Sequence, residues 1–417
     1  MKNYSMINRL LKTLPRTRSY LSITRFKHHS TMPIEVKPCN VLTNSKYPDF
    51  VKNNDSKLYN LIWRTPLQNV LLMKKPWNEK VSRAMINLIY HIDEEYPAVN
   101  VMVSEEVIDD LVKDIHLFDV NKKPVIYTGD MEEIIKKTDL IITLGGDGTI
   151  LRAVSIFLNN NVPPVLSFAM GTLGFLLPFD ISSFKQTFQM VYDSRAKVLH
   201  RNRLECHVIR SGNGHYKDEF ERTNSLDSFE INNYNQNQGK TMVHAMNDIS
   251  LHRGSRPHLT SLDIYVDNEF FTTTTGDGIV LSTPTGSTAY SLSAGGSITH
   301  PSVPCILLTP INPRSLSFRP IILPLSSKVV VQLTPKNRNL SIRLTIDGIP
   351  QPNLQSGDSI QVISESDGCL SLTHSKPDLE DEDRIHKGIW CISRTENDWA
   401  KDINGLLGFN KAFDPKL

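Results

Sequence analysis

The spacing of hydrophobic residues changes about half-way along the chain. From about residue 60 to 180, short apolar runs alternate with segments whose apolar residues recur every three or four positions. The runs predict buried strands, and the other segments predict amphipathic helices. Strands are expected at 69–74, 99–103, 124–127, 140–144 and 165–168, and helices at 81–96, 105–115, 131–137 and 150–158. Strands separated by helices predict a parallel sheet with flanking helices.

After about residue 199, apolar and polar residues alternate instead. The alternation is regular at 262–266, 340–346 and 360–362, and Gly, Pro and Asp-Gly turns interrupt it. Such period-two patterns are typical of antiparallel strands. The sequence therefore predicts an α/β domain over 60–198 and a β-rich domain over 199–392.

Three further segments stand apart from these two domains. Residues 397–409 have helical spacing, so we expect the tail 393–417 to return to the α/β domain. Segments 211–240 and 375–387 are polar, and the second is acidic. We expect both of them to be surface insertions without chemistry.

The first 34 residues carry seven basic residues and no acid. Ile7, Leu10, Leu11 and Leu14 fall on one helical face, and hydroxyl residues are frequent. This composition is typical of a mitochondrial transit peptide, so residues 1–31 are expected to be an address and not part of the fold. A disordered basic tail and a nuclear-import patch are the alternatives.

Charge and hydropathy exclude two classes of protein. The chain has 46 Lys and Arg against 44 Asp and Glu, and a formal net charge of +2. Without the seven N-terminal bases, 39 bases face 44 acids, so the remainder sums to −5. That balance argues against a nucleic-acid binder, which needs an excess of positive charge. No apolar run reaches the roughly 18 residues of a membrane helix, which argues against membrane insertion.

The cysteines give no sign of a disulfide framework or a zinc site. They are five in number, lie far apart and include no CxxC pair. We expect structural thiols in a reducing compartment, and the positions are Cys39, Cys206, Cys305, Cys369 and Cys391.

Ten of the 21 glycines fall in two windows, 145–174 and 276–296. The first window opens with the run GGDGT, residues 145–149, between a predicted strand and a predicted helix. Glycines let backbone N–H groups approach an anion closely, and a helix N-terminus favours phosphate. The carboxylate of Asp147 suits a base that takes a proton from a hydroxyl group, or a ligand of a divalent cation. A tight turn with an Asp cap is the alternative without chemistry.

Other motifs follow in a fixed order along the chain. A second glycine loop, 171–176, follows the next strand, so it would lie beside the first at the carboxyl edge of the sheet. The pair Asn247-Asp248, the run 276–278 (GDG) and the run 283–291 (TPTGSTAYS) come later. The last run has small hydroxyl residues and one aromatic, which can hydrogen-bond and cover a nucleobase. A hydroxyl-rich turn is the alternative. The chain has no P-loop motif and no dehydrogenase fingerprint.

Taken in order, these motifs resemble the ATP-NAD kinase family, and within it the mitochondrial NADH kinases of fungi. The similarity extends over about 60–410. The GGDGT run is shared with lipid kinases and phosphofructokinases, whereas the run STPTGSTAYS at 282–291 is specific to the NAD kinases.

The resemblance implies ATP-dependent phosphorylation of the 2′-hydroxyl on the adenosine ribose of NADH or NAD, giving NADPH or NADP in the mitochondrial matrix. It implies an α/β N-terminal domain, a β-rich C-terminal domain, a homo-oligomer, and Mg²⁺ bound through the ATP phosphates with no protein ligand assigned. Asp147 would be the general base. The ATP phosphates would contact Gly145, Gly146, Gly148 and Thr149. The dinucleotide would contact Phe175, Asn247, Asp248, Asp277, Thr285, Thr288, Ala289, Tyr290 and Ser293.

Two positions depart from the family pattern. Asn247-Asp248 stands where the family often has Asn-Glu, so the carboxylate is one methylene shorter and needs a closer backbone to reach the ribose. Thr275 precedes Gly276 where some relatives have a basic residue.

Two other functions stay open. A lipid or sphingoid-base kinase would share the GGDGT loop but would have no use for residues 283–290. A non-catalytic NAD(H)-binding regulator would keep the fold, although the retained Asp147 argues against it. The preference for NADH over NAD rests on the resemblance alone.

Overall fold

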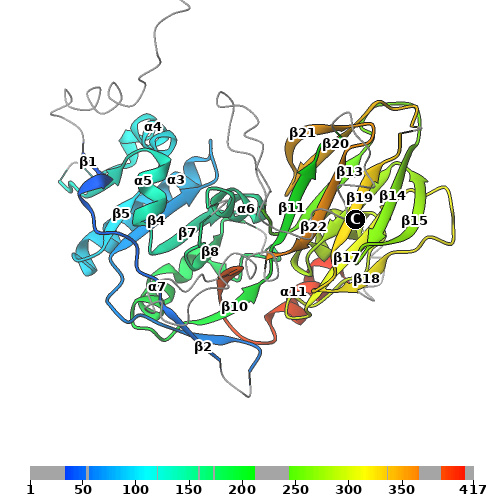
Figure 1. Cartoon of the computed structure of the whole chain (residues 1–417). Coiled ribbons are helices and arrows are strands. Elements are labelled where there is room, and N and C mark those ends of the chain that lie inside the picture. Colours follow the sequence, from blue (N-terminus) through cyan, green and yellow to red (C-terminus); the bar gives the residue numbers. More distant parts are fainter. Residues whose placement is uncertain are drawn as a thin grey trace, which may run out of the picture.

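The computed structural model describes residues 33–52, 56–119, 121–157, 160–171, 174–211, 244–335, 337–365 and 387–408. The predicted address 1–31 and almost all of the two polar insertions lie outside the described residues. The rest forms an α/β domain and a β-rich domain that lie side by side, as Figure 1 shows. The predicted fold class is confirmed.

A sheet of eleven strands forms the centre of the α/β domain (Figure 1). Its order is β1-β6-β5-β4-β7-β8-β23-β10-β3-β2, with β9 paired to β8. Strands β1 to β23 of this order pair in parallel, and β10, β3 and β2 continue the sheet in antiparallel pairs. The strands are β1 (Glu35–Pro38), β2 (Asp49–Lys52), β3 (Tyr59–Ile62), β4 (Asn69–Lys74), β5 (Asn100–Met102), β6 (Val125–Thr128), β7 (Leu140–Gly145), β8 (Val165–Ala169), β9 (Phe179–Asp180), β10 (Lys197–Arg201) and β23 (Ile389–Ser393).

Helices cover both faces of this sheet because both faces of its central strands are apolar. In β4, Val70 and Leu72 pack on one face with α3, α4 and α7, whereas Leu71 and Met73 pack on the other face with α5 and α6. The helices are α3 (Glu79–Glu95), α4 (Glu105–Lys113), α5 (Met131–Lys137), α6 (Asp147–Ser155) and α7 (Phe184–Tyr192), with 3₁₀ turns η1 (Cys39–Val41), η2 (Ile115–Leu117) and η3 (Ile181–Ser183).

Two of these helices begin at a capping side chain. Asn78 accepts the N–H of Val81 at 3.3 Å at the start of α3, and Asp130 accepts the N–H of Glu133 at 2.9 Å at the start of α5. Such bonds satisfy N–H groups that have no partner within the helix.

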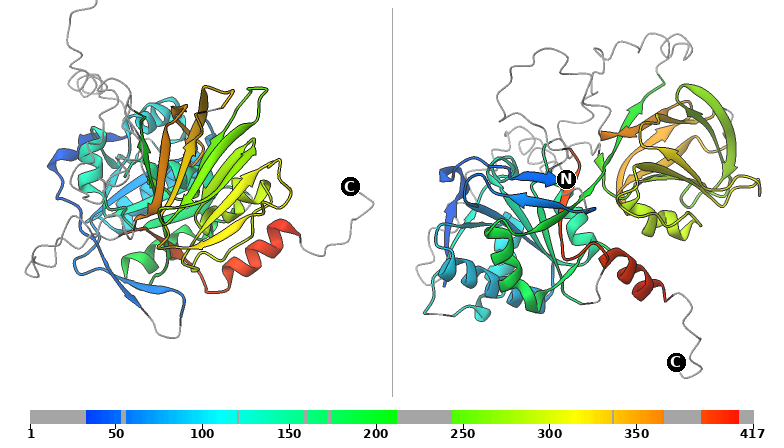
Figure 2. Two further views of the ribbon diagram at one scale, coloured as in Figure 1. Left: turned by 45° about the vertical axis from the view of Figure 1, so that its right-hand side comes forward. Right: turned by 90° about the horizontal axis from the view of Figure 1, so that it is seen from below.

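Two six-stranded antiparallel sheets pack face to face in the β-rich domain, and their inner faces share one hydrophobic core (Figure 2). Their orders are β12-β11-β22-β19-β14-β15 and β18-β17-β16-β13-β20-β21. The strands are β11 (Leu204–Ile209), β12 (His244–Ala245), β13 (Asp248–His252), β14 (Thr260–Val266), β15 (Glu269–Gly276), β16 (Gly278–Ser282), β17 (Cys305–Ile311), β18 (Ile321–Pro324), β19 (Val329–Leu333), β20 (Ser341–Ile346), β21 (Ile349–Gln355) and β22 (Ser359–Ser364).

The structure sets the domain limits differently from the sequence prediction. Most of β10 and most of β23 fall within the predicted β-rich segment 199–392, yet both strands belong to the α/β sheet. β1 and β2 also belong to that sheet, although they precede residue 60. The sequence did not place these strands in their sheet because alternation identifies a strand and does not identify the sheet it joins.

The C-terminal helix forms where the spacing predicted one, as α11 (Asp398–Leu407). The chain returns to the α/β sheet just before it, through β23. The ring of Trp399 on α11 packs edge-on against His300 of the β-rich domain, with centroids 4.8 Å apart. The helix therefore contacts the β-rich domain as well, and does not pack on the α/β domain alone.

The described thiols and helices agree with the chemistry expected of them. Cys39, Cys206, Cys305 and Cys391 are buried and form no disulfide. Burial raises the pKa of each thiol, which keeps it protonated. Among the helices in the described ranges, none is long and apolar enough to span a membrane.

A buried ion pair lies where the chain passes from one domain to the other. Arg203, just before β11, donates from Nε to Glu365 at 2.9 Å, and its Nη2 donates to the other oxygen. Glu365 also accepts the backbone N–H of Gly388, just before β23, at 2.8 Å. The two side chains are only 3% and 10% exposed. Loss of one partner would leave the other charge buried without compensation.

We expect Arg203→Met to lower the free energy of unfolding by about 3–5 kcal/mol, because it strands the Glu365 carboxylate in the interior. Urea unfolding at pH 7 measures this loss. Arg195→Met is the control, since Arg195 pairs with Asp193 while 63% exposed and should cost at most about 1 kcal/mol. Equal losses in the two variants would contradict a structural role for the buried pair.

Candidate active site

Asp147 lies at the carboxyl edge of the parallel sheet, where β7 ends and α6 begins. Its Oδ1 accepts the backbone N–H of Leu176 at 3.1 Å, and the carboxylate also accepts the N–H of Phe175. The two glycine loops are therefore neighbours, as predicted. Burial raises the pKa of Asp147, and these N–H groups and the Arg201 guanidinium oppose the rise. A fixed carboxylate with a raised pKa is suited to accept a proton.

Two different constraints explain why glycine occupies the positions beside Asp147. A Cβ at Gly174 would lie 2.3 Å from Asp147 Oδ1, so the carboxylate itself requires a glycine there. A Cβ at Gly146 or Gly148 would meet nothing within 4 Å. Packing does not explain these two glycines, whereas close approach of a ligand to the backbone does.

Thr149 closes the same turn from inside. Its hydroxyl accepts the N–H of Gly146 at 3.4 Å and would lie 2.2 Å from a Cβ at Gly145. The side chain is buried. Thr149 thus shapes the phosphate loop that the sequence predicted.

A carboxylate that the sequence prediction missed holds the Asn247-Asp248 turn. Asp347 accepts the backbone N–H groups of Met246, Asn247 and Asp248 at 2.8, 2.7 and 3.1 Å. It lies in the two-residue turn between β20 and β21, where Asp347 has φ 48° and Gly348 has φ 76°. Two successive positive φ angles define the tight hairpin turn that an Asp-Gly pair favours.

The carboxyl groups of Asp248 and Asp347 are buried near each other. Burial raises the pKa of Asp248 to about 7, the charge of Asp347 adds to this rise, and the N–H of Tyr290 opposes it. Burial likewise raises the pKa of Asp347 to about 6, against the three N–H bonds. Close carboxylates disfavour double ionisation, so the pair titrates as a unit near neutral pH.

The hydroxyl-rich run packs against this turn as η5 (Thr285–Thr288) and α9 (Tyr290–Ser293). The Thr283 N–H donates to the Asn247 carbonyl at 2.9 Å, and the Thr283 hydroxyl donates to the carbonyl of Met246 at 2.6 Å. A Cβ at Gly286 would lie 2.0 Å from the Asn247 carbonyl oxygen, so this contact requires a glycine. The side-chain oxygen of Asn247 is buried without a partner among the described residues. Such an acceptor is expected to meet a ligand.

Tyr290 is influenced by carboxylates of two other predicted motifs, 247–248 and 276–278. Burial and the charges of Asp248 and Asp277 raise its pKa, so both carboxylates lie near its ring hydroxyl. Asp277 is already bound by protein groups, to Arg253 at 2.6 Å and Asn312 at 3.0 Å, and these bonds lower its pKa. A role for Asp277 in binding the dinucleotide stays a prediction.

The other predicted residues show little direct chemistry. The Thr288 hydroxyl donates to the Thr285 carbonyl at 3.3 Å, and the Ala289 N–H donates to the Gly286 carbonyl at 2.9 Å, so both stabilise the loop. Ser293 is exposed. Their contacts with a dinucleotide stay predictions. The hydroxyl of Thr275, which replaces a basic residue of some relatives, bonds with Ser261 at 2.9 Å.

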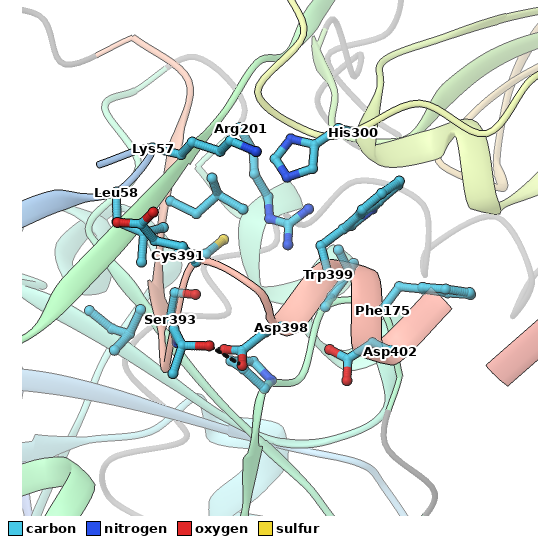
Figure 3. Close-up of a pocket in the computed structure, with 16 residues that line it drawn as sticks. Lys57, Leu58, Phe175, Arg201, His300, Cys391, Ser393, Asp398, Trp399 and Asp402 are labelled. Carbon is cyan, nitrogen blue, oxygen red and sulfur yellow. Dashed lines mark hydrogen bonds between the residues drawn. The ribbon is translucent and has the colours of Figure 1, made fainter. Parts of the chain in front are cut away.

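A pocket between the two domains adjoins the Asp147 loop. Figure 3 shows Lys57, Arg201 and His300 around its inner end, with α11 on the other side. Phe175 is half-buried and lines this pocket, and is not part of a closed core. Sequence reasoning missed Arg201 and His300 because neither lies in one of the glycine or hydroxyl motifs.

Comparison with known proteins agrees with this geometry. Residues 70–196 match the ATP-NAD kinase N-terminal domain, and residues 246–371 match the ATP-NAD kinase C-terminal domain. The chain belongs to the ATP-NAD kinase family. The resemblance drawn from the sequence motifs is thereby confirmed, and the chain is an enzyme.

Individual relatives cover most of the chain. NADH kinase POS5, mitochondrial, of Saccharomyces cerevisiae is 49% identical over 395 residues, covering 91% of this chain and 90% of that protein. NADH kinase pos5, mitochondrial, of Schizosaccharomyces pombe is 34% identical over 405 residues, covering 95% and 90%. The crystal structure of yeast NADH kinase complexed with NADH superposes with a TM-score of 0.75 at 47% identity, covering 92% of this chain and all of that one. An NAD kinase from Archaeoglobus fulgidus in complex with ATP shares the fold, with a TM-score of 0.53 at 15% identity.

We expect Gly174→Ala to lower kcat about 10²-fold, because the new methyl group displaces the Asp147 carboxylate by an ångström or more. Steady-state kinetics with a thermal melt checks this, and the melting temperature should change little. Gly405→Ala on α11 is the control, since a Cβ there meets nothing within 4 Å. Unchanged kcat in Gly174→Ala would show that the position of this carboxylate is not critical.

Asp248→Asn should change how stability depends on pH. The folded pKa of Asp248, about 7, exceeds its unfolded value near 4, so the folded state keeps a proton that the unfolded chain releases. Stability therefore falls as pH rises through this window, and the variant cannot show this fall. Relative to wild type, Asp248→Asn should gain on the order of 2 kcal/mol between pH 5 and pH 8. Urea unfolding of both proteins at pH 5 and at pH 8 measures this gain. If the variant and wild type differed by the same free energy of unfolding at both pH values, Asp248 would not titrate as a buried carboxyl group.

Proposed function

We propose that this chain transfers the γ-phosphoryl group of ATP to the 2′-hydroxyl on the adenosine ribose of NADH, and also of NAD, to form NADPH or NADP. The observation that carries the proposal is the Asp147 carboxylate, which two glycine loops hold away from water at the carboxyl edge of the sheet. The names of the two yeast relatives and the NADH in the solved relative support NADH as an acceptor.

Asp147 acts as the general base. Its carboxylate takes the proton of the 2′-hydroxyl while that oxygen bonds to the γ-phosphorus, the bond to the β–γ bridging oxygen breaks, and ADP leaves. Phosphoryl transfer depends on alignment and charge neutralisation more than on covalent help. A positioned base contributes about 10²–10⁴-fold. The open space at Gly146 and Gly148 lets the ATP phosphates approach the N-terminus of α6.

Mg²⁺ enters this site with ATP. Among the residues that the structure describes, no group of three or more His, Cys, Asp or Glu could hold a metal ion. The ion would be held through the ATP phosphate oxygens with no protein ligand assigned, so that Asp147 keeps its lone pairs for the proton. When bound, the ion neutralises charge on the phosphate oxygens.

The dinucleotide binds against the turn 246–248 and the hydroxyl-rich run. The unpartnered side-chain oxygen of Asn247 accepts the adenine amino group, and Asp248 accepts ribose hydroxyl groups. Phe175, Thr285, Thr288, Ala289, Tyr290, Asp277 and Ser293 complete this site.

The location and assembly of the enzyme rest on its relatives. The mitochondrial names of both yeast proteins support the mitochondrial matrix, in accord with the basic segment 1–31. The homo-oligomer rests on the family resemblance, and light scattering on the purified protein measures it.

One assay separates this function from its alternatives. The chain from Met32 to Leu417 is incubated with ATP, Mg²⁺ and either NADH or NAD, and a dehydrogenase that accepts only the phosphorylated cofactor detects the product. Product formation supports the proposal, and its ratio between the two acceptors gives the redox preference. Dinucleotide binding without product would indicate a non-catalytic regulator, and phosphorylation of a sphingoid base alone would indicate a lipid kinase.

Asp147→Asn should leave the Kd for NADH within about threefold of wild type while kcat falls by about 10²–10⁴-fold, because the amide keeps the shape but cannot accept the proton. Fluorescence titration gives the Kd and the coupled assay gives kcat. Equal losses in binding and turnover would overturn the assignment of Asp147 as the base.

A further inference from the structure

Arg201, the last residue of β10, lies in the pocket of Figure 3, and no carboxylate of the described residues pairs with it. It is 7% exposed. Its Nη1 donates to the Thr285 hydroxyl at 3.2 Å, and the guanidinium also bonds to the Cys391 thiol. Its Nε has no hydrogen-bond partner among the described residues. A buried guanidinium is normally paired with a carboxylate or a phosphate, whereas the hydrogen bonds of Arg201 go to the neutral groups of Thr285 and Cys391.

Arg203 shows what a purely structural arginine looks like at this place in the fold. It lies two residues further along the chain, is equally buried, and is paired through two of its nitrogens with Glu365. Among the described residues, the chain provides a hydrogen-bonded carboxylate for Arg203 and none for Arg201. Because an unpaired buried charge is costly, Arg201 calls for an anion from outside the chain.

The surroundings of Arg201 favour an anion. Lys57 and His300 line the same end of the pocket (Figure 3). Burial and then the charges of Lys57 and Arg201 lower the pKa of His300. Its Nδ1 accepts the N–H of Ser302 at 3.1 Å, so the neutral ring carries its proton on Nε2, as a further donor.

The carboxylates of the pocket lie on the α11 side. Asp398 and Asp402 are 3.6 and 3.9 Å from Arg394, and Asp398 also accepts the N–H and hydroxyl of Thr395. Glu396 lines the same side. Asp398 and Asp402 are thus paired with Arg394 and not with Arg201.

The place of Arg201 identifies the anion. Its charge acts on the Asp147 carboxylate, and its Nη1 holds Thr285 of the dinucleotide loop. Arg201 and Phe175 of the second glycine loop line one pocket, and Arg201 bonds directly to the predicted dinucleotide loop. We propose that the guanidinium of Arg201, which lines the pocket, binds the phosphoryl group that is transferred, first as the γ-phosphate of ATP and afterwards as the 2′-phosphate of the product. This assignment rests on the proposed 2′-phosphorylation.

The test compares two ligands that differ only in that phosphate. Fluorescence titration gives the Kd of NADPH and of NADH for wild type and for Arg201→Met. Loss of one charge-assisted hydrogen bond should weaken NADPH about 10- to 100-fold and NADH by less than about threefold. Equal weakening of both ligands would place Arg201 at the diphosphate, and unchanged binding of both would make it a structural residue; either result overturns the proposal.

Lys197→Met is the matched control. Lys197 is exposed on the same strand, about 13 Å from Arg201, and its loss changes the net charge equally. Both Kd values should stay within about twofold of wild type. If Lys197→Met also weakened NADPH binding selectively, the loss in Arg201→Met would be explained by net charge alone, and the assignment of Arg201 would be overturned.

Arg201→Lys keeps the proposal testable if Arg201→Met does not fold. It retains the charge but lacks the planar fork, so NADPH should weaken about 3- to 10-fold with NADH unchanged. An unchanged ratio of the two Kd values overturns the proposal. The proposed function fails separately, since wild type would then form no NADPH in the coupled assay, whatever the binding ratio.

Discussion

The active site depends on carboxylates whose hydrogen bonds come from backbone N–H groups and not from a paired cationic side chain. Asp147, Asp248 and Asp347 are all bonded in this way, and the pKa of each is raised by burial. A buried carboxylate is costly unless it is hydrogen-bonded, and N–H groups supply those bonds without cancelling the charge. The carboxylates are thereby fixed in place, and the raised pKa of Asp147 makes it a better proton acceptor than an exposed carboxylate.

These carboxylates come from both domains, so their relative positions depend on contacts that connect the two domains. The Arg203–Glu365 pair joins the chain just before β11 to the end of β22, and the bond from Gly388 extends this link to β23. Met246, next to Asn247, is buried in one hydrophobic cluster with residues of β7, α6 and β23. The turn that would bind the dinucleotide is therefore packed against the sheet whose edge carries Asp147.

The sequence was sufficient to predict those parts of the site that follow from the order of neighbouring strands and loops along the chain. Loops at the carboxyl ends of neighbouring parallel strands meet, so the approach of 171–176 to Asp147 could be predicted. Asp347 could not, because it acts on Met246 across 101 residues of chain, through the pairing of β13 with β20. Arg201 and Arg203 look alike in the sequence, and only the distant Glu365 distinguishes them. The sequence also did not predict which sheet β10 and β23 join, because the pattern of a strand does not identify the strands that pair with it.

The short carboxylate of Asp248 shows how such distant contacts compensate for a local change. One methylene less than glutamate requires the backbone to come closer to the ligand. Gly286 lets the Asn247 carbonyl approach within 2.0 Å of where a Cβ would lie, and Asp347 holds the N–H groups of the same turn. The turn is thus fixed from both sides against the hydroxyl-rich run. A longer side chain on a backbone fixed so closely would have less room, so the aspartate and the tight turn are a matched pair.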